Sequence, residues 1–350
     1  MTMKLHVFGA VAVTVTVALL SGCGPSRPSA GTDNTDGDFF FSKSYEKYGQ
    51  GLDESARDTQ QIDRALRRVD PCGFIHEDTL KPVTDMITSY RFGNTLQTCL
   101  LNQPSMPNVG LRIDIRTDVD PAWDESWKDI KIGDVNIKAS SECSYFFPLG
   151  LGELESAPQS EKAKESFNHQ YVSISSSPNS DPGCKLTSAA AQMSAERRGQ
   201  GIPRFDSQSK MWRPLFDQDI CSLFQQLNGY SGYYQDDKSP RACSFYANDT
   251  ATPASAALHL TTRKTLDTSW KIEERNGVKL YVEPGYSEGE YHDCRISVEM
   301  GPAIPPTNID SANSAPANDS SSWPIPVIEV TGQNCEQNKQ VAFAAAKKFT

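Results

Sequence analysis

Cysteine is the residue type whose spacing in this chain most clearly points to chemistry. The 350 residues contain nine cysteines, and the first of them, Cys23, stands apart from the rest. The other eight form two sets of four with similar intervals: Cys72, Cys99, Cys143 and Cys184, then Cys221, Cys243, Cys294 and Cys335. Because the Cys-x-x-Cys spacing of most zinc sites does not occur, we expect disulfides and no bound metal.

Each set of four cysteines allows three pairings, and the sequence alone does not select among them. Locality favours bonding the first cysteine of a set to the second and the third to the fourth, which gives Cys72–Cys99, Cys143–Cys184, Cys221–Cys243 and Cys294–Cys335. Loops of these lengths would each stabilise the fold by about 3–4 kcal/mol by constraining the unfolded chain. Such bonds persist in an oxidising compartment, so the cysteines predict an exported protein.

The histidines and serines do not form a familiar catalytic motif. None of the four histidines beyond Cys23 (His76, His169, His259 and His292) lies in a His-Glu-x-x-His pattern. Two Ser-x-x-Lys sequences, at Ser44 and Ser207, lack the Ser-Asp-Asn and Lys-Thr-Gly partners of a penicillin-binding nucleophile. The trio from His76 to Asp78 could hold a cation or transfer protons, but such a trio is more often the solvated face of a helix. We therefore predict no catalytic residue and no cofactor.

Cys23 closes a short apolar segment that has the parts of a secretory signal. Lys4 supplies a positive charge, residues 7–20 are apolar, and small residues precede the cysteine. Residues 20–23, Leu-Ser-Gly-Cys, resemble the lipobox of bacterial lipoproteins. The resemblance implies cleavage of residues 1–22 and lipidation of Cys23, whereas the alternative is an ordinary signal that contains a cysteine. The apolar segment is too short to span a bilayer, so we expect a lipid anchor on the outer face of the cell membrane.

The composition after Cys23 changes to one that is typical of a solvated segment. Residues 23–54 are rich in Ser, Pro, Gly, Asp and Thr and predict a flexible tether. Phe39, Phe40 and Phe41 interrupt it, and they either dock on the folded body or lie at the lipid surface. The formal net charge is −10, and this acidity disfavours nucleic acid and anionic lipid surfaces as partners.

Matching residues around the two cysteine sets indicate an internal duplication. Asp70-Pro71-Cys72 lines up with Asp219-Ile220-Cys221, and Ser126-Trp127-Lys128 lines up with Ser269-Trp270-Lys271. An alanine-rich segment follows the fourth cysteine of each set. The sequence therefore predicts two tandem related domains, 55–198 and 211–350, joined by a polar linker over 199–210.

Each domain is expected to contain a helix, several consecutive strands and a closing helix. In the first domain, an apolar stripe predicts a helix over 55–69, and Asp70 is expected to cap a second helix from Pro71 to about residue 80. A segment over 302–324 has the composition of a solvated loop. Short connections between strands favour an α+β fold, with an antiparallel sheet flanked by helices and tied by two disulfides in each domain. The expected strands begin near residues 95, 111, 135, 143 and 171, then 243, 258, 279, 295 and 327, and the closing helices begin at Cys184 and Cys335.

The Asp70-Pro71-Cys72 motif and the order of the following cysteines resemble a family of actinobacterial exported lipoproteins of unknown function. The arrangement is also similar to the extracellular sensor domain of mycobacterial membrane serine/threonine kinases. The resemblance covers about 72–198 and, more weakly, 219–350. It implies a module on the cell surface that binds a ligand or partner, with no catalytic residues to carry over.

Trp123 is the one aromatic residue that the sequence marks as a candidate for binding. It lies in a polar connection and has no counterpart in the second domain, whereas Trp127 and Trp270 match and are expected to pack. Trp123 either contacts a partner or covers an edge of the core. We thus expect a lipid-anchored envelope protein that binds or senses an envelope lipid, glycan or protein. The alternatives are an envelope hydrolase with an unfamiliar site and a structural tether for another protein.

Overall fold

Two antiparallel sheets organise the part of the chain that the computed structural model describes. Residues 32–350 cluster as one compact unit. Within the described ranges, no helix has both the length and the apolar character that crossing a membrane would require. The described residues are 35–41, 48, 53–75, 87, 89–103, 106–120, 127–132, 135–140, 143–177, 179, 181–206, 209, 211–235, 239–248, 252–283, 294–308 and 320–350.

The first sheet has eight strands, and the first half of the chain contributes seven of them. Their order is β14-β1-β2-β3-β7-β6-β5-β4, with antiparallel neighbours throughout. The seven are β1 (Ser89–Phe92), β2 (Thr98–Gln103), β3 (Met106–Arg116), β4 (Lys128–Ile132), β5 (Val135–Ala139), β6 (Ser144–Pro148) and β7 (Tyr171–Ser175), and the eighth is β14 (Thr307–Asn308).

The second sheet repeats the first strand for strand. Its order is β11-β12-β13-β15-β10-β9-β8, which matches β4-β5-β6-β7-β3-β2-β1 of the first sheet when each strand is paired with its counterpart. This agreement confirms the predicted α+β fold with two tandem related sheets. The strands are β8 (Tyr230–Tyr234), β9 (Ala242–Ala247), β10 (Ala254–Thr262), β11 (Lys271–Arg275), β12 (Val278–Val282), β13 (Cys294–Glu299) and β15 (Pro324–Gly332).

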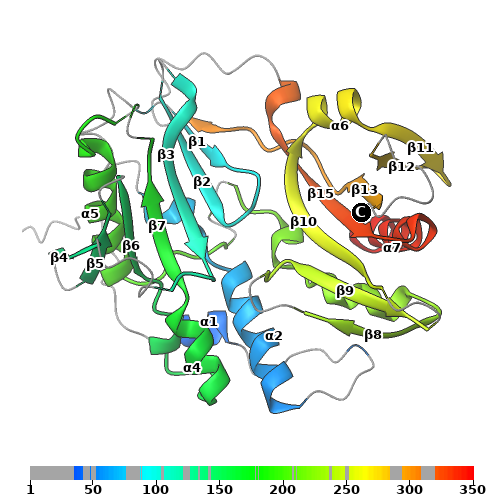
Figure 1. The fold of residues 1–350 in the computed structure, drawn as a ribbon, viewed down its shortest axis with the longest axis horizontal. Helices are drawn as coiled ribbons and strands as arrows, with labels where there is room; N and C mark the ends of the chain where they lie inside the picture. The colour runs from blue at the N-terminus through cyan, green and yellow to red at the C-terminus, as the bar shows by residue number, and fades with distance from the viewer. Residues whose placement is uncertain are drawn as a thin grey trace, which may run out of the picture. The chain divides into compact units, whose positions relative to one another are not determined.

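The two closing helices occupy equivalent places. Helix α5 (Lys185–Gly199) contacts β4 to β7, and α7 (Cys335–Phe349) contacts β10, β12, β13 and β15. Figure 1 shows α7 lying against the second sheet. The remaining helices are α1 (Thr35–Phe40), α2 (Glu54–Arg67), α4 (Glu161–Asn168) and α6 (Arg263–Ser269), with short 3-10 helices η1 (Cys72–Phe74), η3 (Leu151–Glu153), η4 (Pro214–Asp217), η5 (Ile220–Gln226) and η6 (Ser320–Ser322).

The helix predicted over 55–69 is present as α2, and its start follows from a side-chain cap. The Asp53 carboxylate accepts a hydrogen bond from the amide of Ala56 at 2.8 Å, and Ile62 and Leu66 on its apolar stripe are buried. The helix predicted from Pro71 to about residue 80 is shorter than expected. It is the single 3-10 turn η1, because Ile75 already has an extended backbone. Residues 76–80 lie outside the described residues.

The predicted linker over 199–210 is wrong, because its described part belongs to the core. Phe205 is buried, its amide donates to the carbonyl oxygen of Arg68 at 2.8 Å, and its ring contacts Phe92 and Phe216 at 5.7 and 5.9 Å. Phe92 belongs to the first copy and Phe216 to the second. A single cluster of buried residues therefore runs through both copies. Burial of an apolar side chain such as Phe205 is enough to anchor this otherwise polar segment to the core.

Charged groups join α2 to the second copy. The Arg68 guanidinium donates to both carboxylate oxygens of Asp217, at 2.8 and 2.7 Å. The Arg67 side chain donates to the carbonyl oxygen of Pro240 at 3.0 Å. The Arg241 side chain in turn donates to the carbonyl oxygen of Arg67 at 2.7 Å. Arg67 and Arg241 are both buried. Breaking such buried contacts is costly, so the two copies are fixed to each other by polar as well as apolar contacts.

The tether predicted over 23–54 is also wrong in part. Residues 35–40 form α1, and Phe40 and Phe41 are buried in the shared core, as is Tyr48. The ring of Phe39 is flanked by the guanidinium groups of Arg68 and Arg204, each 5.0 Å from its centroid. The three phenylalanines therefore dock on the folded body, since burying their rings outweighs the cost of ordering a short polar segment.

The loop predicted over 302–324 contains ordered parts that bridge the two copies. Ile304 is buried, and β14 pairs with β1 through Ser89 and Tyr90. The second copy thereby adds the eighth strand to the first sheet. Residues 309–319 lie outside the described residues. Composition could not predict this pairing, because a strand of two residues has no periodic pattern of its own.

Candidate functional site

The eight cysteines that the sequence marked form four disulfides in the structure. The bonds are Cys72–Cys99, Cys143–Cys184, Cys221–Cys243 and Cys294–Cys335, which are the pairs that locality favours. The first bond of each copy joins a 3-10 helix to the second strand, η1 to β2 and η5 to β9. The second bond joins the beginning of a strand to the beginning of the closing helix. The four bonds therefore fix both helices of each copy to its sheet.

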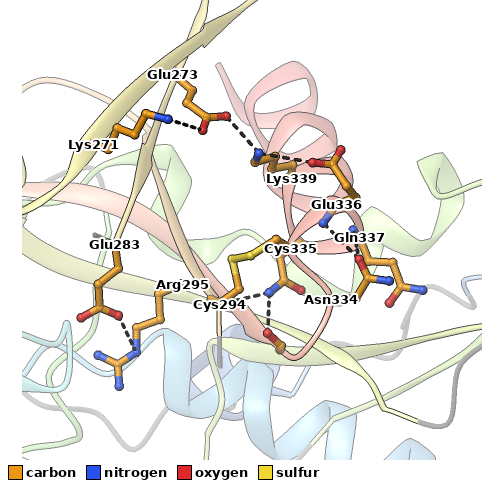
Figure 2. The surroundings of a disulfide bond; sticks show 12 residues. Lys271, Glu273, Glu283, Cys294, Arg295, Asn334, Cys335, Glu336, Gln337 and Lys339 are labelled. Carbon is orange, nitrogen blue, oxygen red and sulfur yellow. Dashed lines mark hydrogen bonds and ion pairs between the residues drawn. A yellow bond between two sulfur atoms is a disulfide. The ribbon is translucent and has the colours of Figure 1, made fainter. Parts of the chain in front are cut away.

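The contacts around Cys294–Cys335 indicate that this disulfide has a structural role, which is to hold α7 on the second sheet (Figure 2). The Lys339 ammonium on α7 pairs with Glu273 of β11 at 3.0 Å and with Glu336 at 3.2 Å, and the hydrogen bond to Glu273 raises the pKa of Lys339. The Asn338 side chain donates to the carbonyl oxygens of Cys294 and Gly332, at 2.8 and 3.0 Å. These contacts hold α7 on the sheet and satisfy backbone acceptors beside the disulfide.

A cleft of about 560 Å³ in the first copy is the site best suited to a ligand. We call it the α4 cleft, and it is lined by Pro148, Gly150, Gly152, Glu153, Lys164, Phe167, Asn168 and Tyr171. These residues come from the end of β6, the turn through η3, helix α4 and the start of β7. Its volume lies within the range of small-molecule sites. Ring side chains form its apolar part, and a carboxylate, an ammonium and an amide provide its polar part.

Local contacts explain how the walls of the α4 cleft are held. Helix α4 is capped by Ser160, whose hydroxyl accepts from the amide of Ala163 at 3.2 Å. On the opposite wall, the backbone of Gly150 has a φ of +80°, which side-chain-bearing residues rarely adopt. A Cβ at Gly152 would lie 2.7 Å from the ring of Phe167, so the turn must be glycine for that ring to lie against it. Phe167 also contacts Phe41 at 6.0 Å.

Both charges in the lining of the α4 cleft already have partners within the chain. The Glu153 carboxylate pairs with Arg198 of α5 at 2.7 Å, and the Lys164 ammonium pairs with Glu161 at 3.2 Å. Burial raises the pKa of Tyr171 above the ordinary tyrosine value of 10.0, so its hydroxyl remains a hydrogen-bond donor at neutral and mildly alkaline pH. The cleft thus offers hydrogen-bonding groups without a net charge in its lining.

The second copy has a smaller pocket, whose lining shares one equivalent strand position with the α4 cleft. Glu299 is the last residue of β13 and pairs with Val327. In the same way, Pro148 of the α4 cleft is the last residue of β6 and pairs with Tyr171. The pocket has a volume of about 390 Å³. Its lining includes Glu299, which accepts from the Tyr281 hydroxyl at 2.7 Å and from Arg263 at 2.8 Å. Burial and the Glu299 carboxylate raise the pKa of Tyr281.

Glu299 in this second pocket is not free for proton transfer. One carboxylate oxygen of Glu299 accepts from Tyr281 and the other accepts from Arg263, so these two donors hold the carboxylate in place. Among the described residues, no group of three His, Cys, Asp or Glu side chains could hold a metal ion. Of the described histidines, His169 has its Nδ1 atom 3.1 Å from the carbonyl oxygen of Val119, and it fixes a loop.

Several residues that the sequence singled out lie outside the described residues: Cys23, Trp123, His76, His292, Ser44 and Ser207. The two matched tryptophans do pack, as predicted. Trp127 stacks on Phe146 with ring centroids 4.4 Å apart, and Trp270 packs against the cluster around Leu266 and Tyr281. Burial is the main cause of the raised pKa of Tyr171, and the nearby Asp120 carboxylate adds to it.

The sequence analysis missed the residues of the α4 cleft. Phe167, Asn168 and Tyr171 have no counterparts that repeat in the second copy, and their spacing forms no motif. The available signal was the short capped helix itself, since Ser160 precedes a helical segment that leads directly into a strand. Comparison with models of protein families, with curated proteins and with solved structures finds no match to this chain.

Proposed function

We propose that this chain is a lipid-anchored protein of the bacterial cell envelope that binds a ligand in the α4 cleft on the extracytoplasmic side. The observation that carries the proposal is the cleft itself, whose rings and hydrogen-bonding groups converge on one concave site. The lipobox-like residues up to Cys23 and the eight paired cysteines support the proposed location, because disulfides persist in oxidising compartments.

Binding is favoured over catalysis by the way the charged groups are held. The charged side chains of the α4 cleft are paired with residues outside it, and Glu299 of the second pocket has both oxygens occupied. A general acid or base needs access to a substrate proton and a pKa that suits the reaction. A rigid scaffold with two disulfides in each copy suits a preformed binding site.

The proposal is tested by native mass spectrometry of residues 24–350 exported from a bacterial host into an oxidising compartment. We expect a bound molecule that leaves on denaturation and that is lost from a Tyr171→Ala variant. Lys162→Ala is the matched control, since Lys162 is exposed on α4 but does not line the cleft. Retention of the same molecule by Tyr171→Ala, or a protein that carries and binds nothing from its own envelope, would contradict the proposal.

Anchoring is tested separately in cells. The native chain is expected in the membrane fraction and to label with a fatty-acid analogue, whereas Cys23→Ser is expected to lose the label. Labelling that persists in the variant would remove Cys23 as the anchor while leaving the binding proposal in place.

A further inference from the structure

The balance of charge and ring surface in the α4 cleft identifies the class of ligand that it fits. We infer that the α4 cleft binds an uncharged glycan, with the face of a sugar ring on Phe167 and Tyr171. This inference rests on the proposed binding function, and it goes further by naming the chemistry of the ligand.

The first argument is electrostatic. The lining contains one carboxylate and one ammonium, and each is within ion-pair distance of a partner in the chain, Arg198 for Glu153 and Glu161 for Lys164. Near Tyr171, Lys138 is likewise paired with Asp129 at 3.1 Å. A phosphate, a nucleotide or a cationic ligand would need an opposite charge that is free to meet it. Both charges of the lining already have partners, so a neutral ligand fits this site without displacing an ion pair.

The second argument concerns the surface of the cleft. Phe167, Tyr171 and Pro148 supply three rings, and Asn168 supplies an amide that can both donate and accept. Aromatic rings bury apolar ligand surface at a low entropic cost, while amide and hydroxyl groups fix its orientation. A sugar has the complementary form, with C–H groups on its ring faces and hydroxyls at its edge. An acyl chain would leave these polar groups without partners.

The third argument is that the site is held in place before a ligand arrives. Phe167 is supported from behind by Phe41, and Arg198 donates to the carbonyl oxygen of Leu149 as well as to Glu153. Supporting contacts of this kind lower the entropy lost on binding. Phe41, which directly follows helix α1, therefore acts as a positioning residue for the cleft without lining it.

The test is isothermal titration of residues 24–350 with neutral tetrasaccharides of glucose, mannose and arabinose, and with tetragalacturonic acid as the charged counterpart. We expect at least one neutral tetrasaccharide to bind with an affinity that does not change between low and high salt, because no ion pairs form. Tyr171→Ala should weaken binding by about 10-fold or more, as removal of an aromatic anchor does. Asn168→Ala should weaken it by a smaller factor, and Lys162→Ala should leave it unchanged.

Asn168 is exposed at the end of α4, so its variant keeps the test valid if Tyr171→Ala does not fold. A preference for tetragalacturonic acid, a strong salt dependence, or binding that survives both variants would overturn the glycan inference. A non-sugar molecule found by native mass spectrometry and lost from Tyr171→Ala would also overturn it, while the binding function would stand. Absence of both sugar binding and a bound molecule would overturn the two together.

Discussion

Asp70 offers the sharpest test of the structure, because its carboxylate is buried at the start of the Asp70-Pro71-Cys72 motif. One oxygen accepts from the amide of Cys72 at 2.9 Å, and the other accepts from the Ser209 hydroxyl at 3.0 Å. Removal from water is the largest effect, and it raises the pKa of Asp70 from 3.8 to about 6 against the opposing effect of these hydrogen bonds. We predict that Asp70→Asn stabilises the protein at neutral and higher pH.

The magnitude follows from the linkage between protonation and folding. A carboxylate whose pKa is higher in the folded protein than in the unfolded chain contributes stability that is fully present below pH 3.8. That stability is lost as the pH rises through about 6. The difference corresponds to about 3 kcal/mol, at 1.36 kcal/mol per pKa unit. An asparagine can keep the bond from Cys72 and donate its amide to the Ser209 hydroxyl, so Asp70→Asn should recover about 2–3 kcal/mol at pH 8.

The assay is equilibrium unfolding in guanidinium chloride at pH 4.5 and pH 8, without reductant. Asp70→Asn should raise the free energy of unfolding at pH 8 and should flatten its fall between the two pH values. Asp219→Asn is the matched control, because Asp219 caps Cys221 in the same way. It also lies 3.8 Å from buried Arg67, so losing its charge should destabilise the protein by about 1–3 kcal/mol. A loss of stability from Asp70→Asn at pH 8, or an equal effect of the two variants, would refute the reasoning.

Three further predictions concern the disulfides, the docked N-terminal helix and the second pocket. Under mild reduction of the folded protein, the disulfides at the starts of α5 and α7 should open first, because each has one partly exposed cysteine whereas both cysteines of the other two disulfides are buried. Differential alkylation followed by peptide mass spectrometry would show the order of opening. Phe40→Ala should lower the free energy of unfolding by about 3–5 kcal/mol, because the ring is fully buried, and a change of under 1 kcal/mol would contradict docking of α1. Glu299→Gln should lower the pKa of Tyr281, because a carboxylate no longer opposes the phenolate, and NMR titration of ring-labelled tyrosine would follow it; an unchanged pKa would show that Glu299 does not act on this tyrosine.

The sequence carried enough information for the covalent framework and the repeated architecture. The two cysteine sets and the matched Trp127 and Trp270 revealed the duplication, because each copy keeps the same side chains at the same places in its sheet. The apolar stripe around Ile62 and Leu66 gave the position of α2, since helix periodicity is a local property. Locality favoured the disulfide pairs that the structure has, although the sequence itself left the alternatives open.

Only the tertiary structure could decide which polar stretches belong to the folded body. Phe40 and Phe205 lie in segments whose composition predicts a tether and a linker, yet both rings are buried in a core shared by the two copies. Composition averages over a window, whereas burial depends on whether a complementary surface exists elsewhere in the fold. The same reason applies to β14, which is ordered by pairing with β1 far away in the sequence.

The α4 cleft was beyond sequence reasoning for a related reason. Pro148, Phe167 and Tyr171 belong to three different elements and come together only because β6 and β7 are neighbours and α4 folds over their ends. Their residue types are ordinary, and their chemistry depends on mutual position and on the charges that Arg198 and Glu161 balance. The sequence thus determined the framework of this protein through local and repeated patterns, while long-range packing alone determined its concave site.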